Sequence, residues 1–133
     1  TPLNNSWGIN NKTVAFRAIN LTPAATRIEV RVAGADLNPY LGLLAVMTAG
    51  RLGLEEKIEP PAAVEGDGWS LDDVPNPFPT SFSEAIDKFS GSAVARAQLG
   101  DRFVDEFSGD RRWQLDQFNR TVTDWELRMF VDS

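Results

Sequence analysis

The sequence predicts an α+β fold, with short antiparallel strands near the start of the chain and a mostly helical C-terminal portion. Two short runs rich in β-branched residues come first, at residues 13–19 and 26–32. Helix-capping residues and apolar residues at helical spacing dominate from residue 38 onward, apart from a proline-rich stretch. At 133 residues, the chain is long enough for a single domain with a modest core.

The two β-like runs, TVAFRAI and TRIEVRV, are separated by the turn-like segment NLTPAA. This arrangement predicts a hairpin or two neighbouring strands. Side chains of a strand alternate between its faces, so Arg27, Glu29 and Arg31 share one face and leave the branched apolar residues on the other. We expect Arg17 of the first run to lie on the same sheet face as these charges.

A helix is expected at residues 38–54, because Asn38 can cap its start and Pro39 suits its first turn. Its apolar residues occupy nearly the whole circumference, which is typical of a helix buried inside a larger domain. A proline-rich surface loop is expected at residues 59–80. Capping-box spacing at Ser81, and again at Thr123, predicts a helical tail over residues 81–131.

Composition and charge exclude several kinds of protein. The chain has 13 Lys and Arg against 19 Asp and Glu, a formal net charge of −6, which argues against broad nucleic-acid binding. It has no Cys and no His, which excludes disulfides, Cys/His zinc sites and a histidine general base within these residues. No apolar run approaches the roughly 18 residues that span a bilayer. We therefore expect a cytoplasmic protein that does not bind membranes.

The chain begins TPLNNSWGIN, without an initiator Met, and runs directly into structured-looking sequence. We expect it to be a fragment of a longer protein, although processing or trimming would look the same.

Four cations, Lys12, Arg17, Arg27 and Arg31, fall within twenty positions around the single carboxylate of Glu29. On spacing alone, a solvated strand face is the favoured interpretation, because exposed ion pairs are common and weak. The alternative is a phosphate site, since converging guanidiniums suit a phosphoryl group in transfer and a lone Glu could hold a bridging divalent cation. One carboxylate cannot complete such a metal site. The preceding WGINNKT stretch is interpreted as a turn anchored by its Trp.

The motifs WG-x-N-N-K-T, T-R-I-E-V-R and G-A-D-x-N-P-Y-L, in this order, resemble the C-terminal part of the glutamine synthetase catalytic domain. The similarity continues through AVMTAGRLGLEEKIEPP, DRFVDEF and TDWELRMF, so it spans essentially the whole chain. The opening Trp-Gly and the ending V-T-D-W-E are closest to the γ-glutamyl-polyamine synthetase-like branch.

The resemblance implies roles for individual residues. Glu29 matches a glutamate that ligates a divalent metal, Mg²⁺ or Mn²⁺, associated with the ATP phosphates. Arg31 matches an arginine that contacts the glutamate substrate and the transferred phosphate, whereas Arg17 and Arg27 match arginines on the ATP side. Lys12 stands where the family usually has an Arg that contacts the γ-phosphate, so Lys12 and Arg31 are the implied catalytic residues.

The resemblance also implies an ATP-dependent ligase. ATP would phosphorylate the γ-carboxylate of glutamate, and ammonia or a small amine or polyamine would displace the phosphate. The family forms large homo-oligomers. Lys12 lacks the bidentate fork of Arg, and Ala24 stands where main glutamine synthetases often carry an ATP-contacting Lys.

The remaining metal ligands of the family lie upstream of the matched region, so we expect the isolated chain to be inactive. Two further interpretations stay open. One is a non-catalytic binding or structural module with the glutamine synthetase fold, and the other is a freestanding helical interaction domain.

Overall fold

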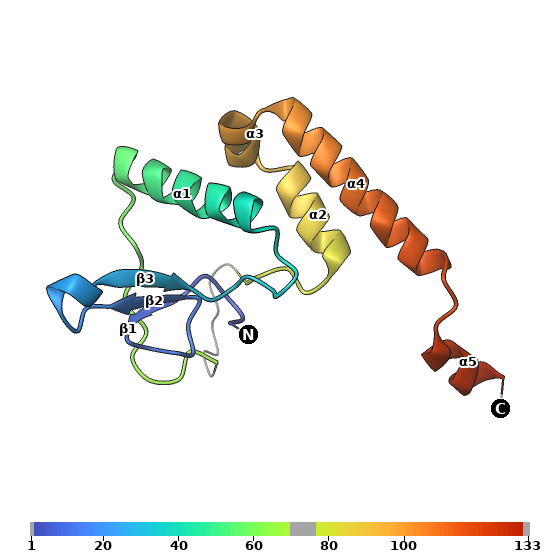
Figure 1. The fold of residues 1–133 in the computed structure, drawn as a ribbon, viewed down its shortest axis with the longest axis horizontal. Helices are drawn as coiled ribbons and strands as arrows, with labels where there is room; N and C mark the ends of the chain where they lie inside the picture. Colours follow the sequence, from blue (N-terminus) through green and yellow to red (C-terminus); the bar gives the residue numbers. More distant parts are fainter. Residues whose placement is uncertain (1, 70–76, 132–133) are drawn as a thin grey trace. The chain divides into compact units, whose positions relative to one another are not determined.

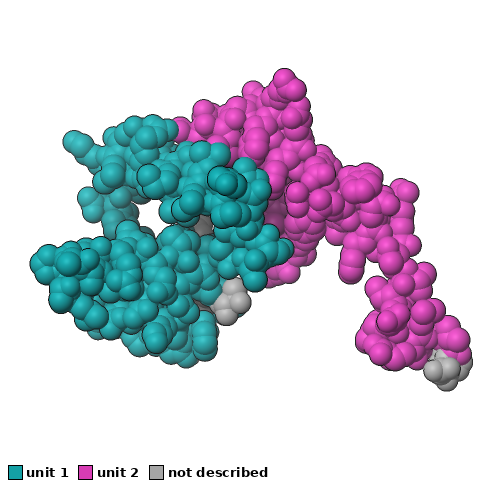
Figure 2. Space-filling model, viewed as in Figure 1, with its two compact units in different colours: residues 1–78 teal, residues 79–133 magenta. Residues whose placement is uncertain are grey.

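The computed structural model describes residues 2–69 and 77–131, and the chain divides into two compact units. Unit 1 comprises residues 1–78 and unit 2 residues 79–133 (Figure 2). Unit 1 holds a three-stranded sheet and one long helix, whereas unit 2 is helical (Figure 1). The predicted α+β class, with strands first and helices after, is confirmed.

The sheet of unit 1 consists of β1 (Trp7–Ile9), β2 (Phe16–Ile19) and β3 (Arg27–Val30), in the order β1-β2-β3. The predicted pairing of the two β-like runs is confirmed, because β2 and β3 are antiparallel. The short 3₁₀ turn between them, Pro23–Ala25, is capped by the Thr22 hydroxyl.

β1 is parallel to β2 and was not predicted as a strand, since WGINNKT was interpreted only as a turn. Three residues are too few to show the alternation that identifies a strand in a sequence. Pairing with β2 holds the segment extended. The pairing continues one residue before β1, where the Phe16 amide donates to the Ser6 carbonyl at 3.0 Å. The sheet is therefore mixed.

The core of unit 1 lies just before β2 and at the end of this strand. Val14 and Ala15 are fully buried, and Ile19 is 3% exposed. Asn4 is the buried polar residue of this region, and its side-chain oxygen accepts from the Ser6 amide at 2.9 Å. These residues fix the position of the chain segment that leads into β2.

Helix α1 (Pro39–Glu55) begins as predicted, with the Asn38 side chain accepting hydrogen bonds from the next amides and Pro39 in the first turn. Burial of this helix inside a larger domain stays a prediction, because the chain by itself does not cover the helix. None of its residues is buried, and Tyr40 and Met47 are 83% and 71% exposed. The helix does not pack closely on a described strand of its own unit, so its apolar circumference has no cover there.

Unit 2 contains α2 (Phe82–Ser90), α3 (Ala93–Leu99), α4 (Asp101–Arg120) and α5 (Asp124–Phe130). The predicted capping box is complete at Thr123. At Ser81 the hydroxyl accepts from the Glu84 amide as predicted, but the Glu84 side chain accepts from the Thr80 amide instead of the Ser81 amide. Among the described residues, no helix combines the length and the apolar character that crossing a bilayer requires.

Helices α2 and α4 pack together through a small aromatic core. Val104 is fully buried and Ile86 is 4% exposed. The ring of Phe107 meets Phe89 edge-on at 5.5 Å between centroids and stacks on Phe103 at 5.7 Å. Edge-to-face and offset-stacked rings add to the stabilisation that burial provides.

Arg96 of α3 joins the helices of unit 2 by polar contacts. Its Nε donates to the Ser90 carbonyl at the end of α2, and its two terminal nitrogens pair with Asp101 and Asp105 of α4 at 2.9 and 2.8 Å. These carboxylates raise the pKa of Arg96, with Asp105 the largest contributor.

Candidate functional site

The charged face of the sheet is organised by the register of β2 and β3. Arg17 lies directly opposite Glu29, and Ile19 lies opposite Arg27. Directly opposed residues of an antiparallel pair project to the same face of the sheet. The expectation that Arg17 shares a face with Glu29 is therefore confirmed.

Glu29 is held between two guanidiniums. The Arg31 Nη1 donates to Glu29 Oε1 at 2.7 Å, and the Arg17 Nη1 lies 3.3 Å from Glu29 Oε2. The three side chains are half-buried rather than free in solvent, at 35% exposure for Glu29, 17% for Arg17 and 30% for Arg31. The arrangement differs from loosely solvated surface charge because each carboxylate oxygen has its own cationic partner.

The hydrogen bond from Arg31 is the largest cause that lowers the pKa of Glu29, and the positive charge of Arg17 lowers it further against the opposing effect of desolvation. Glu29 is thus kept as a carboxylate. Each guanidinium keeps donors that are not used on Glu29, and the buried Nε atoms of Arg17 and Arg31 have no hydrogen-bond partner within the described residues. The terminal N–H groups that bind neither Glu29 nor Asn10 are the donors that an anionic oxygen could use.

Arg27 and Lys12 are not part of this cluster. The Arg27 Nη1 donates to the Ala25 carbonyl at 2.9 Å, in the turn before its own strand. Lys12 is exposed, and in the described part of the chain it forms no ion pair. Of the five residues predicted for the site, the structure brings together Arg17, Glu29 and Arg31.

Glu29 does not make a metal site by itself. Within residues 2–69 and 77–131, no group of three Asp, Glu, His or Cys side chains is placed to hold a metal ion. A divalent cation such as Mg²⁺ prefers several oxygen ligands with near-octahedral geometry, and one carboxylate supplies at most two. The described residues therefore offer a single ligand and not a complete site.

The turn that follows β1 contains polar residues that the sequence interpretation missed. Asn10 adopts a left-handed backbone conformation with φ of 50°, and its side-chain oxygen accepts a short hydrogen bond from the Arg17 Nη2. The next residue, Asn11, binds residues 64–66 through its side chain. The spacing Asn-x-Thr was a usable signal, because Asn and Thr side chains commonly cap the backbone two residues away.

The predicted anchoring of this segment by its Trp is confirmed. The Trp7 Nε1 donates to the Pro61 carbonyl at 2.6 Å, and the Val64 amide donates to the Trp7 carbonyl at 2.8 Å. The segment after α1 that contains Pro61 and Val64 thus lies beside β1 and is hydrogen-bonded to it.

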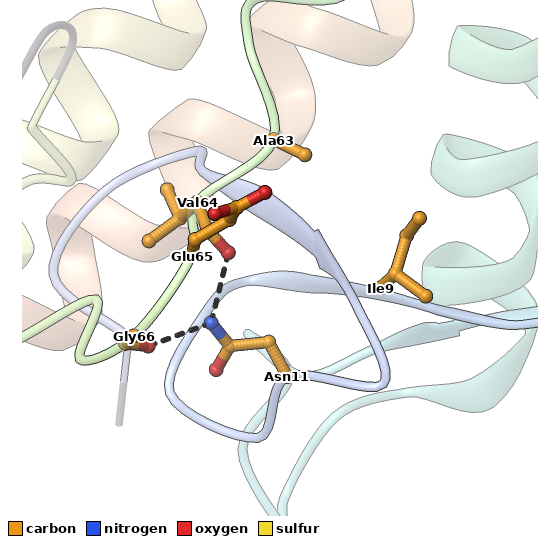
Figure 3. Close-up of a pocket in the computed structure, with 6 residues that line it drawn as sticks. All are labelled: Ile9, Asn11, Ala63, Val64, Glu65 and Gly66. Carbon is orange, nitrogen blue, oxygen red and sulfur yellow. Dashed lines mark hydrogen bonds between the residues drawn. The ribbon is translucent and has the colours of Figure 1, made fainter.

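Two cavities of about 350 Å³ flank this part of unit 1. The cavity drawn in Figure 3 lies between β1 with its turn and the returning segment, and its lining residues are Ile9, Asn11, Ala63, Val64, Glu65 and Gly66. The other lies on the apolar face of the sheet, and its lining residues are Asn5, Trp7, Phe16, Ala18, Ile28, Pro60 and Pro61. The sheet is thus apolar on the face opposite to the arginines.

The chain is similar to known proteins over nearly its whole length. A family described as "Glutamine synthetase, catalytic domain" matches residues 1–130. The chain is 35% identical over 130 residues to the glutamate–isopropylamine ligase of Pseudomonas sp., covering 97% of this chain and 28% of that protein. It is 37% identical over 130 residues to the gamma-glutamylputrescine synthetase PuuA of Escherichia coli (strain K12), covering 98% and 27%.

Solved structures give the same result. The structure titled "Apo GmaS without ligand" superposes with a TM-score of 0.81 at 26% identity, covering 99% of this chain and 31% of that one. The chain therefore spans between a quarter and a third of the length of these relatives. The predicted membership of the glutamine synthetase family is confirmed. The predicted similarity to the γ-glutamyl-polyamine synthetase-like branch is confirmed as well. By its sequence and its fold, the chain belongs to the glutamine synthetase family.

Proposed function

We propose that the chain is the C-terminal part of the catalytic domain of an ATP-dependent glutamate–amine ligase. The observation that carries the proposal is the Arg17–Glu29–Arg31 cluster, in which two guanidiniums converge on one carboxylate and keep unused donors. The cluster lies in a chain that matches the glutamine synthetase catalytic domain over residues 1–130.

In the proposed reaction, a γ-carboxylate oxygen of glutamate attacks the terminal phosphorus of ATP. The bond to the β,γ-bridging oxygen breaks, giving γ-glutamyl phosphate and ADP. The nitrogen of the amine then attacks the γ-carbonyl carbon, inorganic phosphate leaves, and the amine loses a proton as the amide forms. Neither step needs an oxidant or a reductant.

The residues of this chain would act by positioning and by charge stabilisation. Negative charge spreads over the oxygens of a phosphoryl group in transfer, and guanidiniums fixed in place stabilise it without having to reorganise. Arg31 would contact the glutamate and the transferred phosphate, whereas Arg17, Arg27 and Lys12 would contact ATP. Glu29 orients Arg17 and Arg31 and would supply one oxygen ligand to a divalent cation whose other ligands lie outside this chain.

Relatives support an amine as the second substrate. Three relatives are ligases whose names contain isopropylamine, ethanolamide and putrescine. Other relatives are named glutamine synthetases. We propose ammonia or a small amine or polyamine as acceptor, in a complete protein that forms a large homo-oligomer.

The test is an assay of the complete protein with glutamate, MgATP and one amine at a time: ammonia, isopropylamine, ethanolamine or putrescine. ADP release and a γ-glutamyl product that both depend on one amine would support the proposal and identify the acceptor. Absence of amine-dependent ADP release with all four would overturn it. The 133-residue chain alone, assayed in parallel, is expected to show no turnover.

A further inference from the structure

The turn formed by residues 10–13 is tied to the arginine cluster at its first residue. The Asn10 side chain accepts from Arg17, and the Asn10 amide donates to the Ala18 carbonyl at 2.8 Å. Arg17 in turn contacts Glu29. Any shift of this turn therefore disturbs a hydrogen bond to a guanidinium of the proposed site.

The rest of the turn is fixed by Asn11, whose side chain binds the carbonyls of Val64 and Gly66 (Figure 3) and also Thr13. Its Nδ2 donates to the carbonyls of Val64 and Gly66 at 3.1 and 2.9 Å. Its Oδ1 accepts from the Thr13 amide and hydroxyl at 2.9 and 2.6 Å. The Thr13 hydroxyl accepts from the Gly68 amide at 2.7 Å. We call these contacts of Asn11 and Thr13 the turn clamp.

The returning segment that receives the turn clamp is itself held tightly against β1. A Cβ added at Gly8 would lie 2.8 Å from the Val64 carbonyl oxygen, closer than real Cβ atoms approach. The backbones therefore meet at a distance that only glycine permits. The turn clamp joins the turn to a fixed neighbour and not to a loose loop.

Lys12 lies between the two members of the turn clamp. Its side chain is exposed and, within the described residues, forms no ion pair. A lysine is a point charge on a flexible stem, without the planar fork of arginine that fixes geometry by itself. A fixed backbone at Lys12 limits the region that its ammonium group can reach.

We propose that Asn11 is a positioning residue for Lys12: by binding the turn to residues 64–66 and to Thr13, it fixes the backbone from which Lys12 reaches the phosphates of ATP. The inference rests on the proposed function, which assigns Lys12 to the ATP side. It adds a role for Asn11, whose own side chain is fully occupied by protein groups and has no capacity left for a substrate.

The test is a double-mutant cycle on the affinity of the complete protein for MgATP, measured by calorimetric titration. Asn11→Ala and Lys12→Met are made singly and together, and Asn20→Ala, at an exposed asparagine outside the turn, is the matched control. Asn11→Ala alone should weaken MgATP binding about tenfold, which corresponds to roughly 1.4 kcal/mol of binding free energy. In the Lys12→Met background, the same change should weaken it less than about twofold.

Equal weakening in both backgrounds would overturn the inference, because Asn11 would then act independently of Lys12. No effect of Asn11→Ala on MgATP affinity would overturn it as well. If Asn11→Ala fails to fold, Thr13→Val takes its place in the cycle, since it removes only the hydroxyl that joins Asn11 to the Gly68 amide. Faster hydrogen exchange of that amide would show that the turn clamp has opened.

The cycle is read from binding and not from turnover. A protein that binds MgATP but releases no ADP with any amine would overturn the proposed function, and the cycle would still decide whether Asn11 positions Lys12.

Discussion

Arg17 and Glu29 are directly opposed cross-strand partners, and their side chains meet at 3.3 Å between Nη1 and Oε2. Glu29 receives Arg31 from the other side at 2.7 Å. The Glu29 carboxylate therefore holds the two guanidiniums in place, and their positive charge stabilises its ionised form.

Replacing Glu29 by Gln keeps the shape of the side chain but removes the charge that both arginines share. We expect ligase turnover of the complete protein to fall roughly 100-fold, because the arginines lose their orienting partner and a divalent cation loses an oxygen ligand. ADP release at several Mg²⁺ concentrations measures the effect. Glu59→Gln, at an exposed position, is the matched control and should turn over normally. Unchanged turnover in Glu29→Gln would show that the site is elsewhere.

The lowered pKa of Glu29 makes a prediction about stability and pH. Because the folded-state pKa lies below the ordinary carboxyl value, the stability gained from the ion pairs is fully present above that value and is lost as the pH falls through the lowered pKa. Arg31→Met removes the largest cause of the shift. The loss of stability in this variant should therefore be greatest near neutral pH and shrink in acid.

Denaturant unfolding across a pH series measures this difference. Arg27→Met serves as the comparison, because the Arg27 guanidinium donates to the Ala25 carbonyl and not to Glu29. A destabilisation by Arg31→Met that stays constant with pH would contradict the coupling.

Substitutions of Lys12 test whether this residue contacts the phosphates of ATP or is only a surface charge. Lys12→Met should lower kcat/KM for ATP roughly tenfold or more, because a charge facing the phosphates is lost. Lys12→Arg should keep or raise kcat/KM, since the guanidinium can donate two hydrogen bonds to a phosphate. Lys57→Met, which removes an exposed lysine beyond α1, is the control. Equal activity in Lys12→Met and the control would remove Lys12 from the site.

Val104 tests the core of unit 2 independently of the chemistry. Val104→Ala empties space at a fully buried position and should cost roughly 2 kcal/mol of unfolding free energy, which appears as a melting temperature lower by a few degrees. Val94→Ala makes the same change on α3, where the side chain is 56% exposed, and should cost much less. Equal losses in the two variants would place Val104 outside the core.

Local features were predictable from the sequence. Alternation in TRIEVRV placed Glu29 and its arginines on one face, and Asn38 with Pro39 marked the start of α1. These predictions depend on dihedral geometry and hydrogen bonds within a few residues, which neighbouring side chains largely determine. The family motifs added the expected roles of the cluster, which geometry by itself does not assign.

The tertiary structure decided the rest. The register of β2 against β3 placed Arg17 opposite Glu29, while Arg27 turned to a carbonyl of its own turn. The parallel strand β1 depends on its pairing with β2, nine positions along the chain, and the turn clamp depends on contacts more than fifty positions apart, such as Asn11 with Val64. Neither the residues around Asn11 nor those around Val64 show in their sequence that the two segments meet. By itself the sequence determined which residues carry charge and which way they alternate; only the folded chain decided which of those charges meet, because long-range contacts are set by packing and not by local propensity.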